Sequence, residues 1–571
     1  MKIALAQQNY HIGNFEKNRH KIIEGIQWAK SRNADLVVFS ELCVCGYPPR
    51  DFLEFNDFVS SCYHSIDLIK EHADTIGVLI GSPAHNHEKE GKDLFNAVFL
   101  LYEKQIRGIV HKTLLPNYDV FDEYRYFEPA FDWRLLEFKG KKLAVTICED
   151  IWNMGDNPLY RVTPMEKLIP LQPDVMINLS ASPYNYAQDI VRNSIVKANT
   201  LKYRLPLLYC NTVGAQTEIV FDGGSLVYDI NGRKAGEMKY FEEDYQVFDL
   251  EKLSAVSDWQ PEKGGKEAEA YFYSATDVGL GEDTLTYLTG EKNIEEIYHA
   301  LIMGIRDYFQ KMGFGKAILG ASGGIDSAVT QALAAEALGK KNVLAVLMPS
   351  PYSSSHSVTD AKELCHNLGN PLHIIGISEI FDAFLKTLKP VFNDLPFNVA
   401  EENLQSRTRG NLLMAIANKF GYILLNTSNK SELATGYGTL YGDMAGGLSV
   451  LGDVYKMQVY ALAQFINRKK KIIPDSIFTK APSAELRPDQ KDTDSLPEYA
   501  ILDRILYQYI ELRKGPKEII AGGYDAAVVK RILKMVNANE YKRNQFCPII
   551  RVSCKAFGVG RRVPIVGRYL S

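Results

Sequence analysis

The sequence predicts an α/β protein of at least two units, and three observations support this. The chain has 571 residues, more than a single compact core usually contains. Up to about residue 250, short apolar runs typical of buried strands lie close together, with helical patterns between only some of them. After residue 293, strand and helix patterns alternate regularly. The first part therefore indicates a layered α/β arrangement, and the second a doubly wound parallel sheet with helices on both faces.

The apolar runs of the first part are rich in Val, Ile, Leu and Phe, as buried strands require. Two segments between them, 16–30 and 190–203, have helical periodicity. The spacing does not follow the strand–helix–strand rhythm of a simple wound sheet. The strands that we predict lie at 2–6, 36–39, 78–80, 97–101, 143–147, 175–179 and 207–210.

Residues 251–292 lack a long apolar period, because charged residues and glycine pairs interrupt it. We predict a connecting segment there, which separates a domain at 1–250 from a domain at 293–571. The helical pattern of the second domain begins at Ile294, and apolar residues recur at helical spacing to residue 309. The predicted strands that follow lie at 317–319, 343–347, 373–375 and 422–425, and the predicted helices from 326, near 355–368 and at 399–420.

The composition excludes several classes of function. The net charge of −4 argues against non-specific nucleic-acid binding. No run approaches the roughly 20 apolar residues that cross a bilayer, and the N-terminal apolar stretch is too short for a signal-peptide core. The eight cysteines form no CxxC metal pattern, which indicates thiols in a reducing setting. We therefore expect a cytoplasmic protein that contacts neither nucleic acid nor membrane.

The sharpest local pattern lies between a predicted strand and a predicted helix. Adjacent glycines let the backbone approach an anion closely, and amides at a helix start donate hydrogen bonds to it. Ser322 and Ser327 can add hydroxyl donors, and Asp326 can hold Mg²⁺. No lysine follows the glycines as in a P-loop, and GxGxxG is absent here. The segment that we predict to bind ATP consists of Gly320, Ala321, Ser322, Gly323, Gly324, Ile325, Asp326 and Ser327.

This segment resembles the SGGxDS signature of the ATP pyrophosphatases, which cleave ATP between the α and β phosphates to adenylate a substrate. NAD⁺ synthetases, GMP synthetases and asparagine synthetases share that signature. The resemblance therefore implies a reaction class, with ATP as co-substrate and Mg²⁺ as cofactor, and leaves the substrate open.

Further motifs in the second part resemble those of NAD⁺ synthetases and occur in the order of that family. They lie at 401–410, 426–432, 436–443, 453–456, 482–485 and 540–543. The resemblance implies that this part binds deamido-NAD⁺, ATP and Mg²⁺. The implied residues are Asn403, Glu432 and Lys542 for deamido-NAD⁺, Thr427, Lys456 and Ser483 for ATP, and Asp326 and Glu432 for Mg²⁺.

Three residues of the first part suit the hydrolysis of an amide. Cys148, Glu41 and Lys112 each come just after an apolar run, where a sheet presents functional groups. A cysteine amidase needs a thiolate, a base that moves protons and a cation that stabilises the oxyanion. Each residue alone is more often structural, because single cysteines are usually buried hydrophobes and single charges surface residues.

The contexts of these residues resemble the nitrilase superfamily, and more narrowly the glutaminase domain of long-form NAD⁺ synthetases. The motifs are FSEL at 39–42 with GYPP at 46–49, HKTLLP at 111–116 with VFDE at 120–123, and CEDIW at 148–152. The resemblance implies an αββα sandwich in which Glu41 is the general base, Lys112 stabilises the intermediate and Cys148 is the nucleophile. It also implies glutamine contacts at Tyr118, Ser182 and Gln188, although the family usually has a basic residue at the last position.

Two alternatives remain. Another glutamine amidotransferase would use a Cys-His-Glu triad or an N-terminal cysteine, but residue 2 is lysine and no histidine accompanies Cys148 in a triad pattern. A first part without catalytic function would only support an ammonia-dependent synthetase, which the three dispersed residues argue against. A metal cluster at His85, His87 and Glu88 is disfavoured, because these residues lie in a polar loop.

The expected reaction combines both parts. Glutamine hydrolysis releases ammonia, ATP adenylates deamido-NAD⁺, and ammonia displaces AMP. The expected products are NAD⁺, AMP, pyrophosphate and glutamate, and the expected partners are glutamine, ATP, deamido-NAD⁺ and further copies of the chain in a homo-oligomer.

Overall fold

The computed structural model describes residues 1–154, 158–256, 283–393, 395–488 and 490–570. The chain divides into two compact units, Met1–Val278 and Gly279–Ser571, which are described separately below. The predicted connecting segment at 251–292 falls mainly on residues 257–282, which lie outside these ranges.

The first unit is built on two six-stranded sheets. The central strands of each sheet run parallel, and antiparallel strands flank them. A separate hairpin pairs β10 (Val213–Gln216) with β11 (Ile219–Asp222). The first sheet has the order β14 (Asp244–Asp249), β1 (Lys2–Gln7), β2 (Leu36–Val38), β3 (Gly77–His85), β4 (Leu94–Tyr102), β5 (Gln105–His111), and the second has the order β13 (Lys234–Glu237), β12 (Leu226–Tyr228), β9 (Leu207–Asn211), β8 (Val175–Ser180), β7 (Lys141–Ile147), β6 (Leu136–Phe138).

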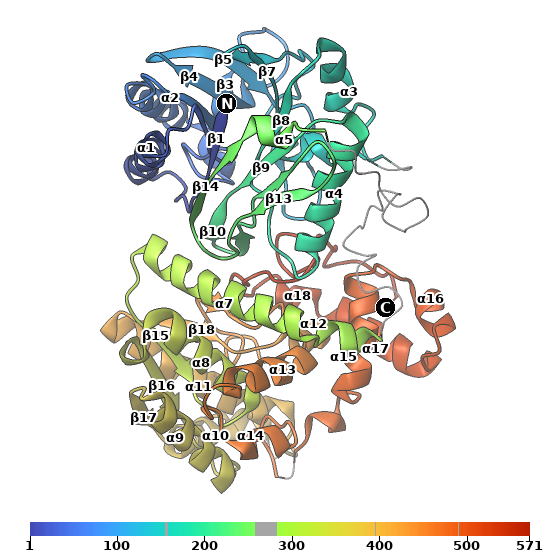
Figure 1. Ribbon diagram of the computed structural model, residues 1–571. Helices are drawn as coiled ribbons and strands as arrows, with labels where there is room; N and C mark the ends of the chain where they lie inside the picture. The colour runs from blue at the N-terminus through green and yellow to red at the C-terminus, as the bar shows by residue number, and fades with distance from the viewer. Residues whose placement is uncertain (155–157, 257–282, 394, 489, 571) are drawn as a thin grey trace. The chain divides into compact units, whose positions relative to one another are not determined.

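Side-chain alternation along the strands explains the layering of this unit. In β1, Ile3 and Leu5 belong to the core between the two sheets, whereas Ala4 and Ala6 face the opposite way, toward helices. The helices α1 (Phe15–Ser31) and α2 (Asn56–Lys70) supply apolar side chains to the core on the outer side of the first sheet, and α3 (Pro164–Leu168) and α4 (Gln188–Tyr203) do so for the second. The predicted αββα sandwich is confirmed (Figure 1).

The second unit contains a five-stranded sheet whose strand pairs are all parallel. The chain starts in the middle, moves to one edge and then returns to the other side, as a doubly wound sheet requires. The strand order is β17 (Leu372–Ile374), β16 (Val343–Leu347), β15 (Ala317–Gly320), β18 (Ile423–Asn426), β19 (Leu448–Ser449).

Helices cover both faces of this sheet. In β16, Leu344 and Val346 belong to one apolar core and Ala345 and Leu347 to another, so successive residues face opposite helical layers. The prediction of a doubly wound parallel sheet is therefore confirmed (Figure 1). Among the described residues, the helices of this unit are α6 (Thr284–Leu288), α7 (Glu291–Met312), α8 (Ile325–Leu338), α9 (Ser355–Leu368), α10 (Ser378–Phe392), α11 (Val399–Phe420), α12 (Lys430–Thr435), α13 (Lys456–Asn467), α14 (Asp475–Thr479), α15 (Tyr499–Ile510), α16 (Pro516–Ala521), α17 (Ala526–Ala538) and α18 (Glu540–Arg543).

Local capping explains why predicted and observed boundaries agree at α11. Asn398 accepts a hydrogen bond from Ala400 N, and the Glu401 carboxylate accepts one from Asn398 N. Gly421 ends the helix in the left-handed conformation, with φ of 68°. The predicted strand at 373–375 is shifted by one residue in the structure, where β17 spans Leu372–Ile374.

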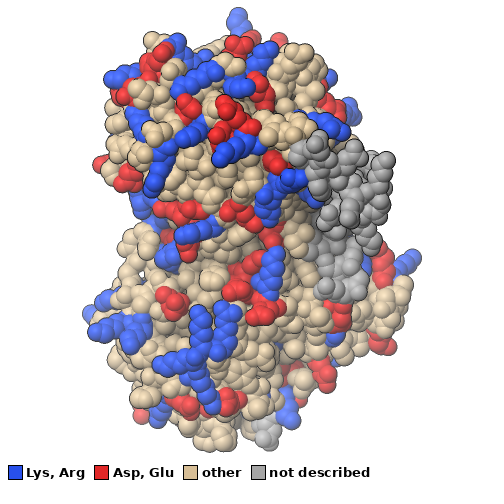
Figure 2. All heavy atoms as spheres, viewed as in Figure 1, with Lys and Arg blue, Asp and Glu red and all other residues tan. Residues whose placement is uncertain are grey.

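Within the described ranges, no helix combines the length and the apolar character that a bilayer crossing requires. On the face shown in Figure 2, blue and red side chains are interspersed on each unit.

Candidate active sites

The first site is centred on Cys148, which follows β7 directly. Its backbone has φ of 40°, the left-handed region that a non-glycine residue rarely adopts. Asp150 holds this turn, because its carboxylate accepts hydrogen bonds from Ile147 N at 3.0 Å and Leu114 N at 2.8 Å. The bond from Leu114 connects the Cys148 turn to the segment that follows Lys112.

Lys112 lies fully buried between two carboxylates. Its Nζ donates to Glu41 Oε1 at 2.7 Å and to both oxygens of Glu123, at 2.9 and 2.8 Å. Asn96 Nδ2 donates to Glu41 at 2.7 Å, and Ala181 N donates to the other Glu41 oxygen at 3.0 Å. The Glu41 carboxylate is therefore oriented by three donors from separate strands and loops.

Burial and charge determine the protonation of this site. Burial acts to lower the pKa of Lys112, but the charges of Glu123 and Glu41 outweigh it, so the pKa lies well above its ordinary value. Burial raises the pKa of the Cys148 thiol well above its ordinary value, and the charge of Glu41 adds to this while Lys112 opposes it. The resting thiol is therefore protonated, and attack by the sulfur requires a base to take the proton.

The three residues implied to contact glutamine fall into two places. The Tyr118 hydroxyl donates to the Glu149 oxygens at 2.9 and 3.1 Å, directly beside Cys148 in the chain. Gln188, the first residue of α4, donates through Nε2 to Ser182 Oγ at 3.4 Å. The structure therefore brings Ser182 and Gln188 together, and places Tyr118 against a carboxylate.

Two acidic residues of this site were missed as functional residues in the sequence. Glu123 forms the second carboxylate partner of Lys112, and the VFDE motif that contains it does not indicate that role. Glu149 also accepts from Tyr160 at 3.1 Å, and burial raises the pKa of Glu149 to about 7. The sequence shows only that these two acidic residues lie close to the motifs of Lys112 and Cys148. It does not show that their side chains point into the site.

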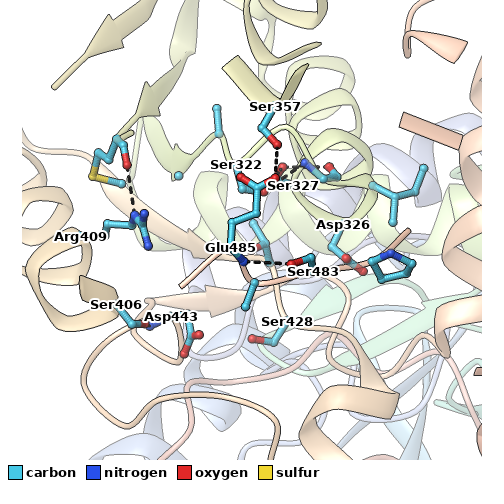
Figure 3. Close-up of a pocket in the computed structure, with 18 of the residues that line it drawn as sticks. Ser322, Asp326, Ser327, Ser357, Ser406, Arg409, Ser428, Asp443, Ser483 and Glu485 are labelled. Carbon is cyan, nitrogen blue, oxygen red and sulfur yellow. Dashed lines mark hydrogen bonds between the residues drawn. The ribbon is translucent and has the colours of Figure 1, made fainter. Parts of the chain in front are cut away.

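The second site is a cavity of about 280 Å³ at the carboxyl ends of β15, β16 and β18 (Figure 3). Seven of the eight residues of the predicted ATP segment line it, and Gly323 packs behind it. Thr427, Glu432, Lys456 and Ser483 line it as well. The structure thus brings every residue predicted to contact ATP to one cavity, or to the loop that forms its wall.

The glycine-rich loop is held by its own serines. Ser322 Oγ lies 3.0 Å from Ser327 Oγ and accepts from Gly324 N at 3.2 Å. Gly323 has φ of 76°, and a Cβ there would lie 2.2 Å from the backbone oxygen of Ser357. Glycine is therefore required at this position for both conformation and space.

Two carboxylates and a lysine form the charged wall of the cavity. Lys456 Nζ lies 2.6 Å from Asp326 Oδ2 and 3.6 Å from Glu432 Oε1. Asn429 donates to the other Asp326 oxygen at 2.9 Å. Burial, followed by the charge of Asp326, raises the pKa of Glu432 to about 8. Oxygen ligands whose negative charges repel each other suit a divalent cation, so these residues fit Mg²⁺.

Of the three residues implied to contact deamido-NAD⁺, Glu432 lines the cavity, and Asn403 and Lys542 bond to the segment that follows α12. Lys542 Nζ donates to the backbone oxygens of Gly436 at 2.8 Å and Gly438 at 2.9 Å. Asn403 Oδ1 accepts from Thr439 Oγ1 at 2.7 Å. Both side chains therefore hold the segment that follows α12.

Comparison with known families separates the chain in the same way. Residues 2–259 match the Carbon-nitrogen hydrolase family, and residues 297–546 match the NAD synthase family. A glutamine-dependent NAD(+) synthetase of Synechocystis sp. is 44% identical over 99% of this chain and 98% of its own length. Another with the same name, from Thermotoga maritima, is 41% identical over 100% of this chain and 99% of its own length.

A solved structure is similar over the same extent. The glutamine-dependent NAD⁺ synthetase of Acinetobacter baumannii, solved with adenosine diphosphate, is 37% identical and covers 99% of this chain and 98% of its own, with a TM-score of 0.73. Two α/β units, one of the carbon–nitrogen hydrolase type and one of the NAD synthase type, define an ATP-dependent amidating ligase. The chain belongs to the glutamine-dependent NAD⁺ synthetase family. The predicted family, fold class and enzyme class are confirmed.

Proposed function

We propose that the chain hydrolyses glutamine in its first unit and uses the ammonia to convert deamido-NAD⁺ to NAD⁺ in its second. One observation carries the proposal: a single chain contains both the buried Cys148–Lys112–Glu41 group and a cavity built on the glycine-rich loop. The test follows NAD⁺ formation from deamido-NAD⁺, ATP and Mg²⁺ with glutamine or with ammonium as nitrogen donor. Turnover of another acceptor, such as XMP or aspartate, without NAD⁺ formation would exclude the proposed substrate.

In the first unit, Cys148 Sγ attacks the side-chain carbonyl carbon of glutamine while Glu41 accepts the thiol proton. Lys112 donates a hydrogen bond to the oxyanion that forms. Glu41 returns the proton to the nitrogen, ammonia leaves, and a γ-glutamyl thioester remains on Cys148. Water, deprotonated by Glu41, then hydrolyses the thioester to glutamate. Glu123 keeps Lys112 charged and in position throughout.

In the second unit, the nicotinate carboxylate of deamido-NAD⁺ attacks the α phosphate of ATP, and pyrophosphate leaves. Ammonia then attacks the adenylated carboxyl carbon, AMP leaves, and the amide of NAD⁺ is formed. The glycine-rich loop donates backbone and hydroxyl hydrogen bonds to the phosphates, and Lys456 supplies a positive charge. Asp326 and Glu432 would hold Mg²⁺, which neutralises phosphate charge when bound.

The setting that we propose is a homo-oligomer in the cytoplasm. The eight cysteines of the chain are free thiols, which supports a reducing compartment. Analytical ultracentrifugation measures the oligomeric state directly, and a monomer at assay concentrations would contradict this part of the proposal.

Glu149 should make glutamine use dependent on pH. Its carboxylate lies beside Cys148 and next to Tyr118, so we expect it to bind the α-ammonium group of glutamine as the charged form. Because burial raises its pKa to about 7, the charged form is present above pH 7 and is lost as the pH falls. We expect kcat/KM for glutamine to fall about tenfold from pH 8 to pH 6.

Glu149→Gln should have a low and nearly constant kcat/KM for glutamine over this range. Ammonium-supported synthesis, measured over the same pH series and corrected for free ammonia, serves as the control. If Glu149→Gln keeps the full pH dependence of the unchanged chain, a group other than Glu149 causes the pH dependence of glutamine use.

Lys542→Ala should weaken the use of deamido-NAD⁺ more than that of ATP. Lys542 holds the Gly436–Gly438 backbone and lies outside the residues that line the ATP cavity. A hydrogen bond from a charged group contributes about 1.5–3 kcal/mol, so KM for deamido-NAD⁺ should rise at least about tenfold. Lys534→Ala, an exposed lysine of α17, is the matched control. If KM for ATP alone rises, the assignment of Lys542 is wrong.

A further inference from the structure

In the cavity of the second site, the carboxylate of Glu485 accepts hydrogen bonds from a set of converging donors. The Glu485 oxygens accept from Ser354 N at 3.1 Å, Ser354 Oγ at 2.8 Å and Ser357 Oγ at 2.8 Å. Lys480 Nζ lies 2.6 Å from Glu485 Oε1 and also contacts Ser357 Oγ. One backbone amide, two hydroxyls and one ammonium therefore converge on a single anionic group.

These donors lie next to the glycine-rich loop. Ser357, Lys480 and Glu485 line the same cavity as Ser322 and Asp326. The missing Cβ of Gly323 lets the loop contact the Ser357 backbone directly. Figure 3 shows the Glu485 carboxylate bonded to Ser357, close to Ser322 and Ser327. An anion bound by the loop would therefore extend toward the position that Glu485 occupies.

The Glu485 side chain is charged and its backbone is strained. Burial acts to raise the pKa of Glu485, but hydrogen bonds from Lys480, Ser357 and Ser354 outweigh it and lower the pKa below its ordinary value. Glu485 has φ of 50°, which is uncommon for a non-glycine residue. A strained residue held by donors to its side chain can move when those donors bind another anion.

A phosphate oxygen requires the same donors as a carboxylate oxygen. Lysine is a common phosphate ligand, and hydroxyls and backbone amides complete such sites. The loop residues Ser322–Ser327 and the donor set around Lys480 together offer a longer anion-binding surface than one phosphate needs. The leaving group of the proposed reaction, pyrophosphate, has two adjacent phosphates.

We propose that Lys480, Ser354 and Ser357 form a subsite for the terminal phosphates of ATP and for pyrophosphate, and that Glu485 occupies this subsite when no nucleotide is bound. This rests on the proposed function, because it extends the ATP cavity of that reaction. Glu485 competes with the phosphates for the donors, so its carboxylate leaves when ATP binds and returns to them as pyrophosphate departs. Lys480 is thus a binding residue, and Glu485 an internal competitor.

Substitutions of Lys480 and of Glu485 should have opposite effects on pyrophosphate affinity. Lys480→Ala removes a charged donor and should weaken binding about tenfold or more. Glu485→Ala removes the competitor. If Glu485 occupies the subsite in about 90% of the nucleotide-free molecules, its removal should strengthen pyrophosphate binding about tenfold. Glu485→Gln keeps the shape without the charge and should also strengthen binding.

Titration calorimetry of inorganic pyrophosphate with Mg²⁺ into the full chain measures these affinities without any turnover. Lys469→Ala and Asp494→Asn remove exposed charges outside the cavity and should leave the affinity unchanged. If Lys480 and Glu485 form only a structural ion pair, both variants weaken binding or neither changes it, and the proposal is wrong. Circular dichroism shows whether Glu485→Ala is folded. If it is misfolded, Glu485→Gln decides whether loss of the carboxylate charge strengthens or weakens pyrophosphate binding.

The same preparations separate this inference from the proposed function. Ammonium-supported NAD⁺ formation by the unchanged chain tests the reaction itself. If NAD⁺ forms and the opposite effects are absent, only the subsite is wrong. If no NAD⁺ forms, the reaction is wrong, and the calorimetry still shows whether Glu485 competes with pyrophosphate.

Discussion

Cys148→Ala should abolish glutamine-supported NAD⁺ formation and leave ammonium-supported formation intact. The variant lacks the thiol that forms the thioester in the proposed reaction, so we expect a loss of roughly a thousandfold or more in kcat with glutamine. Alanine removes one buried atom, and the Lys112, Glu41 and Asp150 contacts do not involve the sulfur. The fold should therefore be preserved.

The comparison of the two nitrogen donors decides the outcome. Cys45→Ala is a matched control, because Cys45 is also buried in the first unit and belongs to its apolar core. We expect it to retain glutamine use. Equal loss with glutamine and ammonium in Cys148→Ala would contradict two separate sites. Full glutamine use by Cys148→Ala would contradict the nucleophile.

Much of the fold could be predicted because it depends on local patterns. Continuous apolar runs marked the buried strands of both units, and the capping residues Asn398 and Gly421 define a helix that periodicity alone located. The edge strands were harder. The strand β13 is mostly exposed and lacks an apolar pattern, so its sequence resembles that of a loop.

The site residues could be named only where a motif carried them. Glu123 lies 11 positions after Lys112, in a short 3₁₀ turn, and nothing in the spacing shows that both side chains point into one buried space. Lys456 and Asp326 are separated by 130 positions and meet because α13 packs against α8. Such pairs depend on how elements pack, which local periodicity does not contain.

Roles are harder to predict than positions. The resemblance implied that Lys542 and Asn403 contact deamido-NAD⁺, and in the structure both bond to the loop at Gly436–Thr439. A residue that holds a binding loop and a residue that touches the ligand have the same sequence signature. Lys542→Ala tests whether Lys542 supports the use of deamido-NAD⁺ through either role.

Asp326→Asn should lower NAD⁺ formation by at least about a hundredfold with either nitrogen donor. Asp326 is the partner of Lys456 at 2.6 Å and one of two carboxylates that fit Mg²⁺. Asparagine keeps the shape of the side chain, and its amide cannot replace the charge that a divalent cation and Lys456 both require. The loss should appear in kcat, because phosphate charge is neutralised most in the transition state.

Glutamate release from glutamine, measured without ATP, should remain in Asp326→Asn, because that reaction uses residues of the first unit only. Asp360→Asn is a suitable control, since Asp360 is a buried acid of α9 that bonds Ser476 and does not line the cavity. Raising the Mg²⁺ concentration should partly restore Asp326→Asn if the lost charge weakened metal binding. A folded Asp326→Asn with unimpaired ammonium-supported synthesis would show that Asp326 serves neither the metal nor the phosphates.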